Sequence, residues 1–183
     1  MSDSTIYSIG HGNKKTEDFI RELKAFDIAY LLDIRSKPYS KWNPAFNKNE
    51  LENSLKENGI AYVFLGNQLG GLPSDTSCYD SEGKVVYDLI KDKEFFKEGL
   101  KRLIRANEKK IKLAIMCSET YPGECHRSKL VGQELLKNGI SLNHIVSDKL
   151  VKSQETVMTE LTKGLGTVDL FGNVKEFVSR KSY

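Results

Sequence analysis

Five side chains able to do chemistry are concentrated in one short stretch of the chain. They lie between an apolar run at 113–116, typical of a buried strand, and a helical pattern that continues to about residue 137. Pro122-Gly123 predicts a turn between the two. The five residues are Cys117, Glu119, Cys125, His126 and Arg127.

Cys117 is a candidate nucleophile, because a thiol at a strand end beside a helix N-terminus can lose its proton more easily. Glu119 is a candidate general acid or base. A helix N-terminus also attracts anions, so Cys125, His126 and Arg127 border a potential anion site. The alternative for Cys117 is a buried, inert thiol, which is the commoner role of a free cysteine.

The sequence offers sulfur and nitrogen donors, but their spacing does not indicate a metal centre. Cys117, Cys125 and His126 follow the pattern C-x7-C-H, which matches no common zinc motif. We therefore expect no metal and no cofactor. A disulfide between Cys117 and Cys125 stays open as an alternative.

The surrounding pattern alternates between apolar runs and amphipathic segments. Strands are predicted at 6–9, 28–34, 60–65, 113–116 and 141–146, with helices between them. A long loop is predicted at 66–84, followed by a helix or helix pair from about 85 to 107. This order predicts a three-layer α/β domain: a mostly parallel five-stranded sheet with helices on both faces, and a C-terminal helical tail. We expect residues 1–150 to form the domain and 151–183 to pack on it, as a helix at 154–161 and a final helix, or to be partly flexible.

Polar residues follow each of the first four predicted strands, whereas the opposite loops contain only helix-stop residues. In parallel α/β sheets ligands bind at the carboxyl ends of the strands, so these residues predict one shared cleft. His11 is a candidate acid or base, or else fixes its own turn. The candidate substrate- or anion-binding residues at the first three strand ends are Gly10, Asn13, Asp33, Arg35, Ser36, Gly70 and Gly71.

The loop at 35–48 mixes basic and aromatic side chains. Lys37, Lys41 and Trp42 are candidate contacts to nucleic acid, because cations pair with phosphates and aromatic rings stack on bases. The alternative is a solvated basic loop.

The composition is that of an ordinary folded domain. The chain has 183 residues, of which 39% are hydrophobic and 29% charged, and a formal charge of +3 that does not by itself indicate a nucleic-acid partner. No apolar run reaches the ~20 residues of a membrane span, and the polar start is not a signal peptide. We expect a cytoplasmic protein without a membrane partner; the oligomeric state is left open.

Four separated motifs resemble the DUF488 family of uncharacterised proteins. They are IGHGN, LLDIRSKPYSKWNPAFN, the LGG at 69–71 and MCSETYPGECHR. The resemblance runs from about residue 6 to 146 and implies a compact cytoplasmic α/β domain, with no assigned activity. Separately, the TVDLF segment at 167–171 is similar to the clamp-binding peptide of bacterial replication and repair proteins, so Val168–Phe171 is a candidate contact to a sliding clamp.

Together these patterns predict an enzyme acting on a nucleotide or nucleic-acid phosphate-containing substrate in a cleft at the carboxyl ends of the strands. It would be a hydrolase or transferase with a cysteine nucleophile or a carboxylate acid/base. The alternative is a non-catalytic module that binds nucleotide or nucleic acid in the same cleft.

Overall fold

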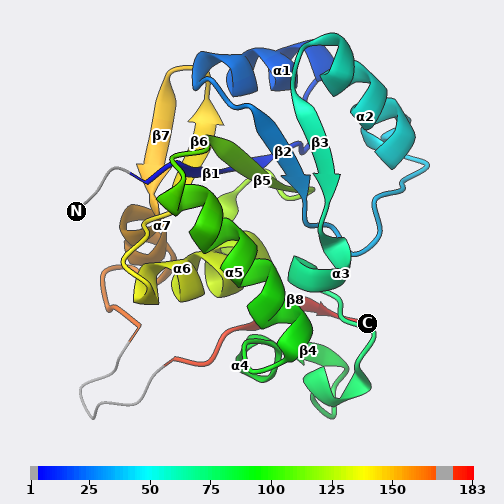
Figure 1. Cartoon of the computed structure of the whole chain (residues 1–183). Coiled ribbons are helices and arrows are strands. Elements are labelled where there is room, and N and C mark those ends of the chain that lie inside the picture. The colour runs from blue at the N-terminus through cyan, green and yellow to red at the C-terminus, as the bar shows by residue number, and fades with distance from the viewer. Residues whose placement is uncertain (1–3, 168–174) are drawn as a thin grey trace.

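One six-stranded sheet runs through the centre of the protein in the computed structural model, which describes residues 4–167 and 175–183 (Figure 1). The strands lie in the order β3-β2-β5-β1-β6-β7. Five are parallel, and β7 is antiparallel to β6. The predicted mostly parallel α/β sheet is therefore confirmed, with one more strand than expected. The strands are β1 (Ile6–Gly10), β2 (Tyr30–Asp33), β3 (Ala61–Phe64), β5 (Leu113–Cys117), β6 (Asn143–Ser147) and β7 (Leu150–Ser153).

Helices cover both faces of this sheet. On one face Phe19 and Leu23 of α1 and Leu51 of α2 pack in a single apolar cluster. On the other face Phe96 of α5 and Leu135 of α6 belong to a second cluster. The helices are α1 (Thr16–Ala25), α2 (Lys48–Glu57), α3 (Gly66–Leu69), α4 (Tyr87–Ile90), α5 (Glu94–Glu108), α6 (Gln133–Lys137) and α7 (Gln154–Leu161).

The central strand β5 explains why the site-bearing turn is held rigidly. All five of its residues are buried, and its side chains alternate between the two clusters, with Ile115 in one and Met116 in the other. β1 and β2 flank it on either side. Cys117, the last residue of β5, therefore lies at the carboxyl end of a fully buried strand between β1 and β2.

Two regions differ from the sequence-based expectation. The predicted loop at 66–84 contains α3 and a 3-10 turn at Thr76–Cys78. The helix or helix pair expected from about 85 to 107 is present as the pair α4 and α5, but strand β4 (Lys84–Val86) precedes it. The helix predicted at 154–161 is confirmed as α7. The described end of the chain, however, forms strand β8 (Val178–Ser182) instead of a final helix.

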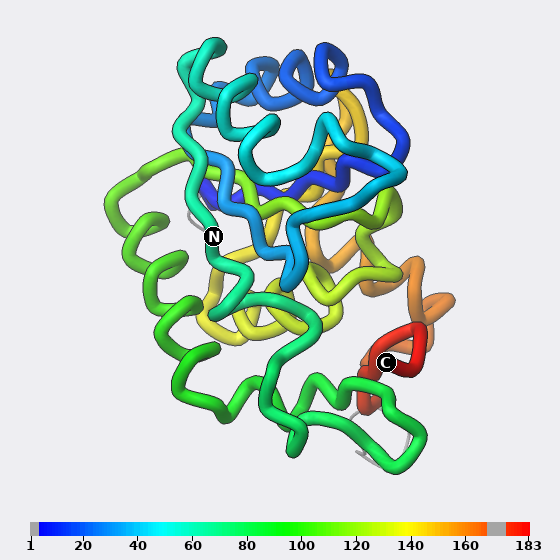
Figure 2. The backbone as a smooth tube through the Cα atoms, turned by 90° about the vertical axis from the view of Figure 1, so that its right-hand side faces the viewer, coloured from blue at the N-terminus to red at the C-terminus, as the bar shows by residue number. Residues whose placement is uncertain are grey.

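Strand β8 lies antiparallel to β4, and Figure 2 shows the red C-terminal segment beside the green segment that carries β4. Val85 N–H donates to the Ser179 hydroxyl, and Tyr87 N–H donates to the Phe177 carbonyl. These bonds join segments about half the chain apart, so the local sequence pattern does not predict them. The pairing brings the end of the chain next to the carboxyl ends of the parallel strands.

Within residues 4–167 and 175–183, no helix has the length and apolar character needed to cross a membrane.

Candidate functional site

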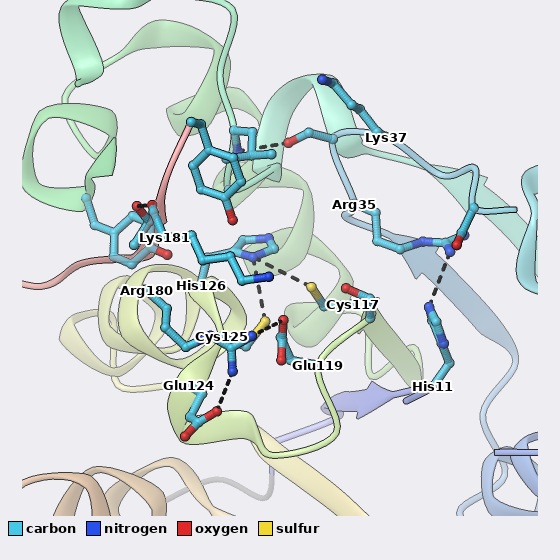
Figure 3. Close-up of a pocket in the computed structure, with 18 of the residues that line it drawn as sticks. His11, Arg35, Lys37, Cys117, Glu119, Glu124, Cys125, His126, Arg180 and Lys181 are labelled. Atoms are coloured by element: carbon cyan, nitrogen blue, oxygen red, sulfur yellow. Dashed lines mark hydrogen bonds and ion pairs between the residues drawn. The ribbon is translucent and has the colours of Figure 1, made fainter. Parts of the chain in front are cut away.

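A cleft of about 330 Å³ opens at the carboxyl ends of β1, β2 and β5. Figure 3 shows its side chains converging from these strand ends and from the C-terminal segment. The sequence-predicted residues that line it are His11, Arg35, Ser36, Lys37, Gly71, Cys117, Glu119, Cys125 and His126. The structure therefore brings residues from all four predicted strand ends into one space.

Two cysteines and a histidine form the floor of this cleft. Cys117 ends β5, and Cys125 immediately precedes the helical segment that contains a π-helical turn (Arg127–Gly132) and then α6. His126 Nδ1 lies 3.7 Å from Cys117 Sγ and 3.6 Å from Cys125 Sγ. His126 Nε2 lies 3.2 Å from the Ile34 carbonyl oxygen, which can only accept a hydrogen bond, so Nε2 carries a hydrogen. Nδ1 is the ring atom that faces the two sulfurs.

The two thiols of this floor differ in acidity. A hydrogen bond with Cys125 and the charge of His126 hold the pKa of Cys117 well below its ordinary value, against the opposing effect of burial. Burial and the neighbouring Cys117 sulfur raise the pKa of Cys125. Cys117 is thus the more acidic thiol of the pair, and Cys125 is the hydrogen-bond donor to it. Such an arrangement activates a cysteine for nucleophilic attack.

Arg127 has a different role from the predicted grip on an anion. Its side chain is 1% exposed and does not line the cleft. Its guanidinium donates to the carbonyl oxygens of Glu119 at 2.8 Å and Thr120 at 3.0 Å. Arg127 therefore shapes the loop between the two cysteines. The sequence placed Arg127 correctly near the loop, but whether a side chain turns inward or outward depends on the loop conformation.

Gly10 has a packing role beside the same loop. A Cβ atom there would lie 1.9 Å from the Glu119 carbonyl oxygen and 2.6 Å from the Arg127 guanidinium. Gly10 does not line the cleft, so it makes room for the loop and not for a ligand. Asn13 is exposed and also lies outside the cleft lining.

Asp33 and Arg35 form a buried ion pair at the end of β2. The Asp33 carboxylate accepts from the Arg35 Nε at 2.9 Å, from its Nη2 at 2.7 Å and from the Tyr62 hydroxyl at 2.8 Å. Asp33 is fully buried, whereas Arg35 lines the cleft. Asp33 therefore orients Arg35 from below, and the Arg35 guanidinium places a positive charge at the cleft wall.

His11 lies beside Arg35 on the same wall (Figure 3). His11 Nδ1 donates to the Gly12 carbonyl at 2.9 Å, which leaves Nε2 as the acceptor facing Arg35 Nη1 at 3.4 Å. The ring stacks on Phe46 at 4.5 Å. Burial lowers the pKa of His11, and the Arg35 charge lowers it further. His11 is therefore a neutral imidazole whose Nε2 acceptor faces Arg35 on the cleft wall.

The two glycines after β3 allow close packing around the floor. A Cβ atom on Gly71 would lie 2.8 Å from the His126 ring, and one on Gly70 would lie 2.3 Å from the Ser36 hydroxyl. Ser36 Oγ in turn accepts from Leu72 N–H at 2.9 Å. Gly71 and Ser36 line the cleft, but Gly70 does not. Gly70 therefore positions Ser36 and not a ligand.

The basic aromatic loop is divided between the cleft and the outer surface. Lys37 lines the cleft, whereas Lys41 and Trp42 do not. Trp42 is 86% exposed, and Lys41 Nζ lies over its ring at 5.1 Å. Asn47 Oδ1 accepts from Ser40 N–H and so ties the loop to the start of α2.

Several lining residues were missed by the sequence reasoning, because they come from segments without a clear pattern. Arg180 of β8 donates to Glu124 Oε2 at 2.8 Å and to Glu119 Oε1 at 3.2 Å. The missed residues that carry polar or aromatic groups are Tyr87, Ser118, Glu124, Ser179, Arg180, Lys181 and Tyr183. Only the pairing of β8 with β4 brings the last four to the cleft.

The donor atoms of Cys117, Cys125 and His126 all lie within 4.8 Å of one another, close enough for a soft metal ion in principle. The hydrogen bonds among these three side chains, and from His126 to Ile34, already account for their arrangement. We therefore interpret the group as an activated thiol.

Other predicted features fall away from the cleft. His144 is fully buried between Ser8 Oγ at 2.6 Å and Gln154 Oε1 at 2.8 Å, so its role is structural. Cys78 is fully buried in the apolar core. The candidate clamp-binding segment Val168–Phe171 lies outside the described residues.

Comparison with known proteins places the chain without assigning it an activity. No curated protein and no solved structure matches it. One family model, described as "Domain of unknown function DUF488", matches residues 15–133. This match covers well over half of the chain and contains β2, β3, β5 and both cleft cysteines. The chain therefore belongs to the DUF488 family.

Proposed function

We propose that this protein is an enzyme, a hydrolase or transferase, that uses Cys117 as a nucleophile on a phosphate-containing substrate. The observation that carries the proposal is the position of the Cys117 sulfur. It lies on the floor of the cleft, 3.7 Å from His126 Nδ1, and His126 is itself held by the Ile34 carbonyl. A nucleophile, a base beside it and a group that orients the base are the usual parts of an activated thiol site.

The charge of the cleft supports an anionic substrate. Four basic side chains line it, namely Arg35, Lys37, Arg180 and Lys181, against the two carboxylates of Glu119 and Glu124. The Asp33 carboxylate that balances Arg35 lies beneath the wall and is fully buried. The excess of positive charge favours a phosphate group over a neutral or cationic ligand.

The proposed reaction has two steps and uses three side chains of the cleft. The Cys117 thiolate attacks the phosphorus atom of a phosphoester, the bond to the leaving oxygen breaks, and Glu119 transfers a proton from solvent to this oxygen. The phosphoryl group is then carried on sulfur. His11 Nε2 takes a proton from a water molecule or a second alcohol, which attacks phosphorus and restores the Cys117 thiolate.

Turnover of defined phosphoesters tests this proposal. The purified protein is incubated with nucleoside mono- and triphosphates, a dinucleotide and an aryl phosphate, and the released products are quantified. We expect turnover of at least one substrate, with a loss of roughly a thousandfold or more in Cys117→Ser. Cys78→Ala, which changes a buried core thiol away from the cleft, serves as the matched control and keeps the rate.

Two results would contradict the proposal. One is a Cys117→Ser variant that turns over the substrate at the wild-type rate. The other is no turnover of any of these substrates by a folded wild-type protein with a free Cys117 thiol.

The second candidate function is a non-catalytic module that binds nucleic acid, and the exposed Trp42 beside Lys41 favours it. Here an unpaired base would stack on Trp42 while Lys37 and Lys41 contact the phosphates. Anisotropy of a labelled single-stranded oligonucleotide measures this. We expect binding that weakens steeply between about 50 and 200 mM salt. Trp42→Ala and Lys41→Ala should weaken it, whereas Lys109→Ala, an exposed lysine at the end of α5, should not.

A further inference from the structure

The two cleft cysteines are close neighbours in space although seven residues separate them in sequence. Cys117 Sγ and Cys125 Sγ both contact His126 Nδ1, and the three donor atoms lie within 4.8 Å of one another. Both side chains line the cleft, and of the two buried residues Cys117 is the more exposed, at 6% against 2% for Cys125. Cys78, the third cysteine, lies in the apolar core and lines neither this cleft nor the pair.

The two sulfurs have unequal partners, which gives them different chemical roles. Cys117 receives hydrogen bonds and is the better nucleophile, while Cys125 is the donor and keeps its proton. Cys125 Sγ also accepts from Arg127 N–H at 3.5 Å, at the start of the helical segment. An attacking thiolate with a protonated thiol next to it is the arrangement in which an oxidised cysteine is resolved to a disulfide.

Hydrogen bonds fix the loop between Cys117 and Cys125 and so hold the two cysteines close together. Arg127 holds the carbonyls of Glu119 and Thr120, and Cys125 N–H donates to the Pro122 carbonyl at 3.1 Å. β5 fixes the other end of the loop in the sheet. A disulfide requires a sulfur–sulfur distance of about 2.05 Å. The two sulfurs lie within 4.8 Å of one another, so rotation of their side chains or a shift of residues 118–124 has to close the remaining gap.

We propose that Cys117 is an oxidation site for hydroperoxides and that the oxidised sulfur closes an intramolecular disulfide with Cys125. This modification rests on the same thiolate as the proposed function. The Cys117 thiolate attacks one oxygen of the peroxide, the O–O bond breaks, and the products are a Cys117 sulfenic acid and hydroxide. The Cys125 thiol then attacks the Cys117 sulfur, the S–O bond breaks, and water leaves. The peroxide is reduced and the two thiols are oxidised.

The consequence is a reversible block of the nucleophile. In the disulfide, Cys117 has no lone thiolate to attack phosphorus, and His126 loses both of its sulfur hydrogen-bond partners. A thiol reductant restores the pair through a mixed disulfide. Without Cys125, the Cys117 sulfenic acid proceeds instead to sulfinic and sulfonic acids, which such reductants do not reverse.

Mass spectrometry of the whole protein's digest tests the proposal. The folded protein is treated with hydrogen peroxide, denatured, and alkylated with iodoacetamide. Trypsin cuts after Lys112 and Arg127, so one peptide carries both cleft cysteines, and a separate peptide carries Cys78. We expect the first peptide to appear unalkylated and lighter by two hydrogen atoms than its reduced form. Cys78 should be fully alkylated and acts as the internal control.

Cleavage after Glu119 and Glu124 adds a direct check, because both sites lie between the cysteines. The two fragments should stay joined after peroxide treatment and separate after dithiothreitol. In Cys125→Ser and Cys125→Ala, Cys117 should gain two or three oxygen atoms at the same peroxide dose. In Cys117→Ser, Cys125 should stay alkylatable.

Two results would overturn the proposal. One is that Cys117 and Cys125 are both still alkylated at the highest peroxide dose that leaves Cys78 reduced. The other is that Cys78 is oxidised as fast as the two cleft cysteines. These readouts need no catalytic turnover. Disulfide formation without phosphoester turnover would therefore sustain this inference and contradict the proposed function, and the opposite pair of results would do the reverse.

Discussion

His126 Nδ1 lies 3.7 Å from Cys117 Sγ, while the Nε2 atom of the same ring lies 3.2 Å from the Ile34 carbonyl oxygen. The carbonyl belongs to the residue that follows β2, and the sulfur belongs to the last residue of β5. Adjacent parallel strands thus orient one imidazole between them. Because the Ile34 carbonyl binds the Nε2 hydrogen, Nδ1 is always the atom that faces the Cys117 and Cys125 sulfurs.

The buried Arg127 guanidinium holds the loop between Cys117 and Cys125 by two hydrogen bonds to backbone carbonyls. We predict that Arg127→Met lowers the free energy of unfolding by on the order of 3 kcal/mol, because the Glu119 and Thr120 carbonyls lose charged donors. Urea unfolding measures this loss. Arg180→Met removes an arginine that is about half exposed and paired with Glu119 and Glu124, and should cost less than about 1 kcal/mol. Equal losses in the two variants would contradict the account.

Gly71 lies against the His126 ring, so a methyl group there should disturb the thiol site more than the fold. In Gly71→Ala the added Cβ would lie 2.8 Å from two ring atoms, and the ring must move away. We predict that alkylation of Cys117 slows by roughly tenfold, since small misplacements of a catalytic group have large effects on rate.

The control for Gly71→Ala is Gly139→Ala, which adds a methyl group into open space at a φ of +73°. It should cost about 1 kcal/mol of stability and leave the alkylation rate unchanged. If the two variants alkylate at the same rate, Gly71 does not position His126.

His144 should make the protein less stable as the pH falls. Burial lowers the pKa of His144 to about 4 from an ordinary value of 6.5. The unfolded chain therefore binds a proton between pH 6.5 and 4 that the folded protein does not, so the free energy of unfolding falls as pH falls through this window, by about 3 kcal/mol in total. Urea unfolding at several pH values measures the slope.

The contribution of His144 is the difference in slope between the wild type and His144→Asn. The variant is expected to be less stable at pH 7, because the bonds to Ser8 and Gln154 are disturbed, but its stability should change less between pH 6.5 and 4. An unchanged slope in His144→Asn would show that other groups account for the pH dependence.

The parallel part of the fold was predictable because each of its strands lies in an apolar run, and helices that pack on the sheet follow three of them. Helix α1 follows β1, α2 follows β2, and α6 follows β5, whereas β3 and β6 could be predicted from their apolar runs alone. β7 was not predicted, because Leu150–Ser153 is a short edge strand of mixed polarity whose formation depends on its neighbour β6. β4 and β8 were missed for a related reason: their pairing partners are about 90 residues apart in the sequence.

The place of the cleft was predictable from topology, but the direction of individual side chains was not. His11, Arg35, Cys117 and His126 line the cleft because they follow parallel strands. Arg127 comes from the same stretch, yet it turns inward to backbone carbonyls. Arg180 joins the cleft only through the tertiary pairing of β8.

The central claim is that Cys117 is an activated thiolate, and the pH dependence of its alkylation tests this most directly. Iodoacetamide labelling of the folded protein is followed on the peptide of residues 113–127, with fragmentation to separate Cys117 from Cys125. We predict a midpoint well below the value of about 8.5 for an ordinary cysteine, shifted upward in His126→Asn. A Cys117 midpoint at or above that of an ordinary cysteine, unchanged by His126→Asn, would contradict the account.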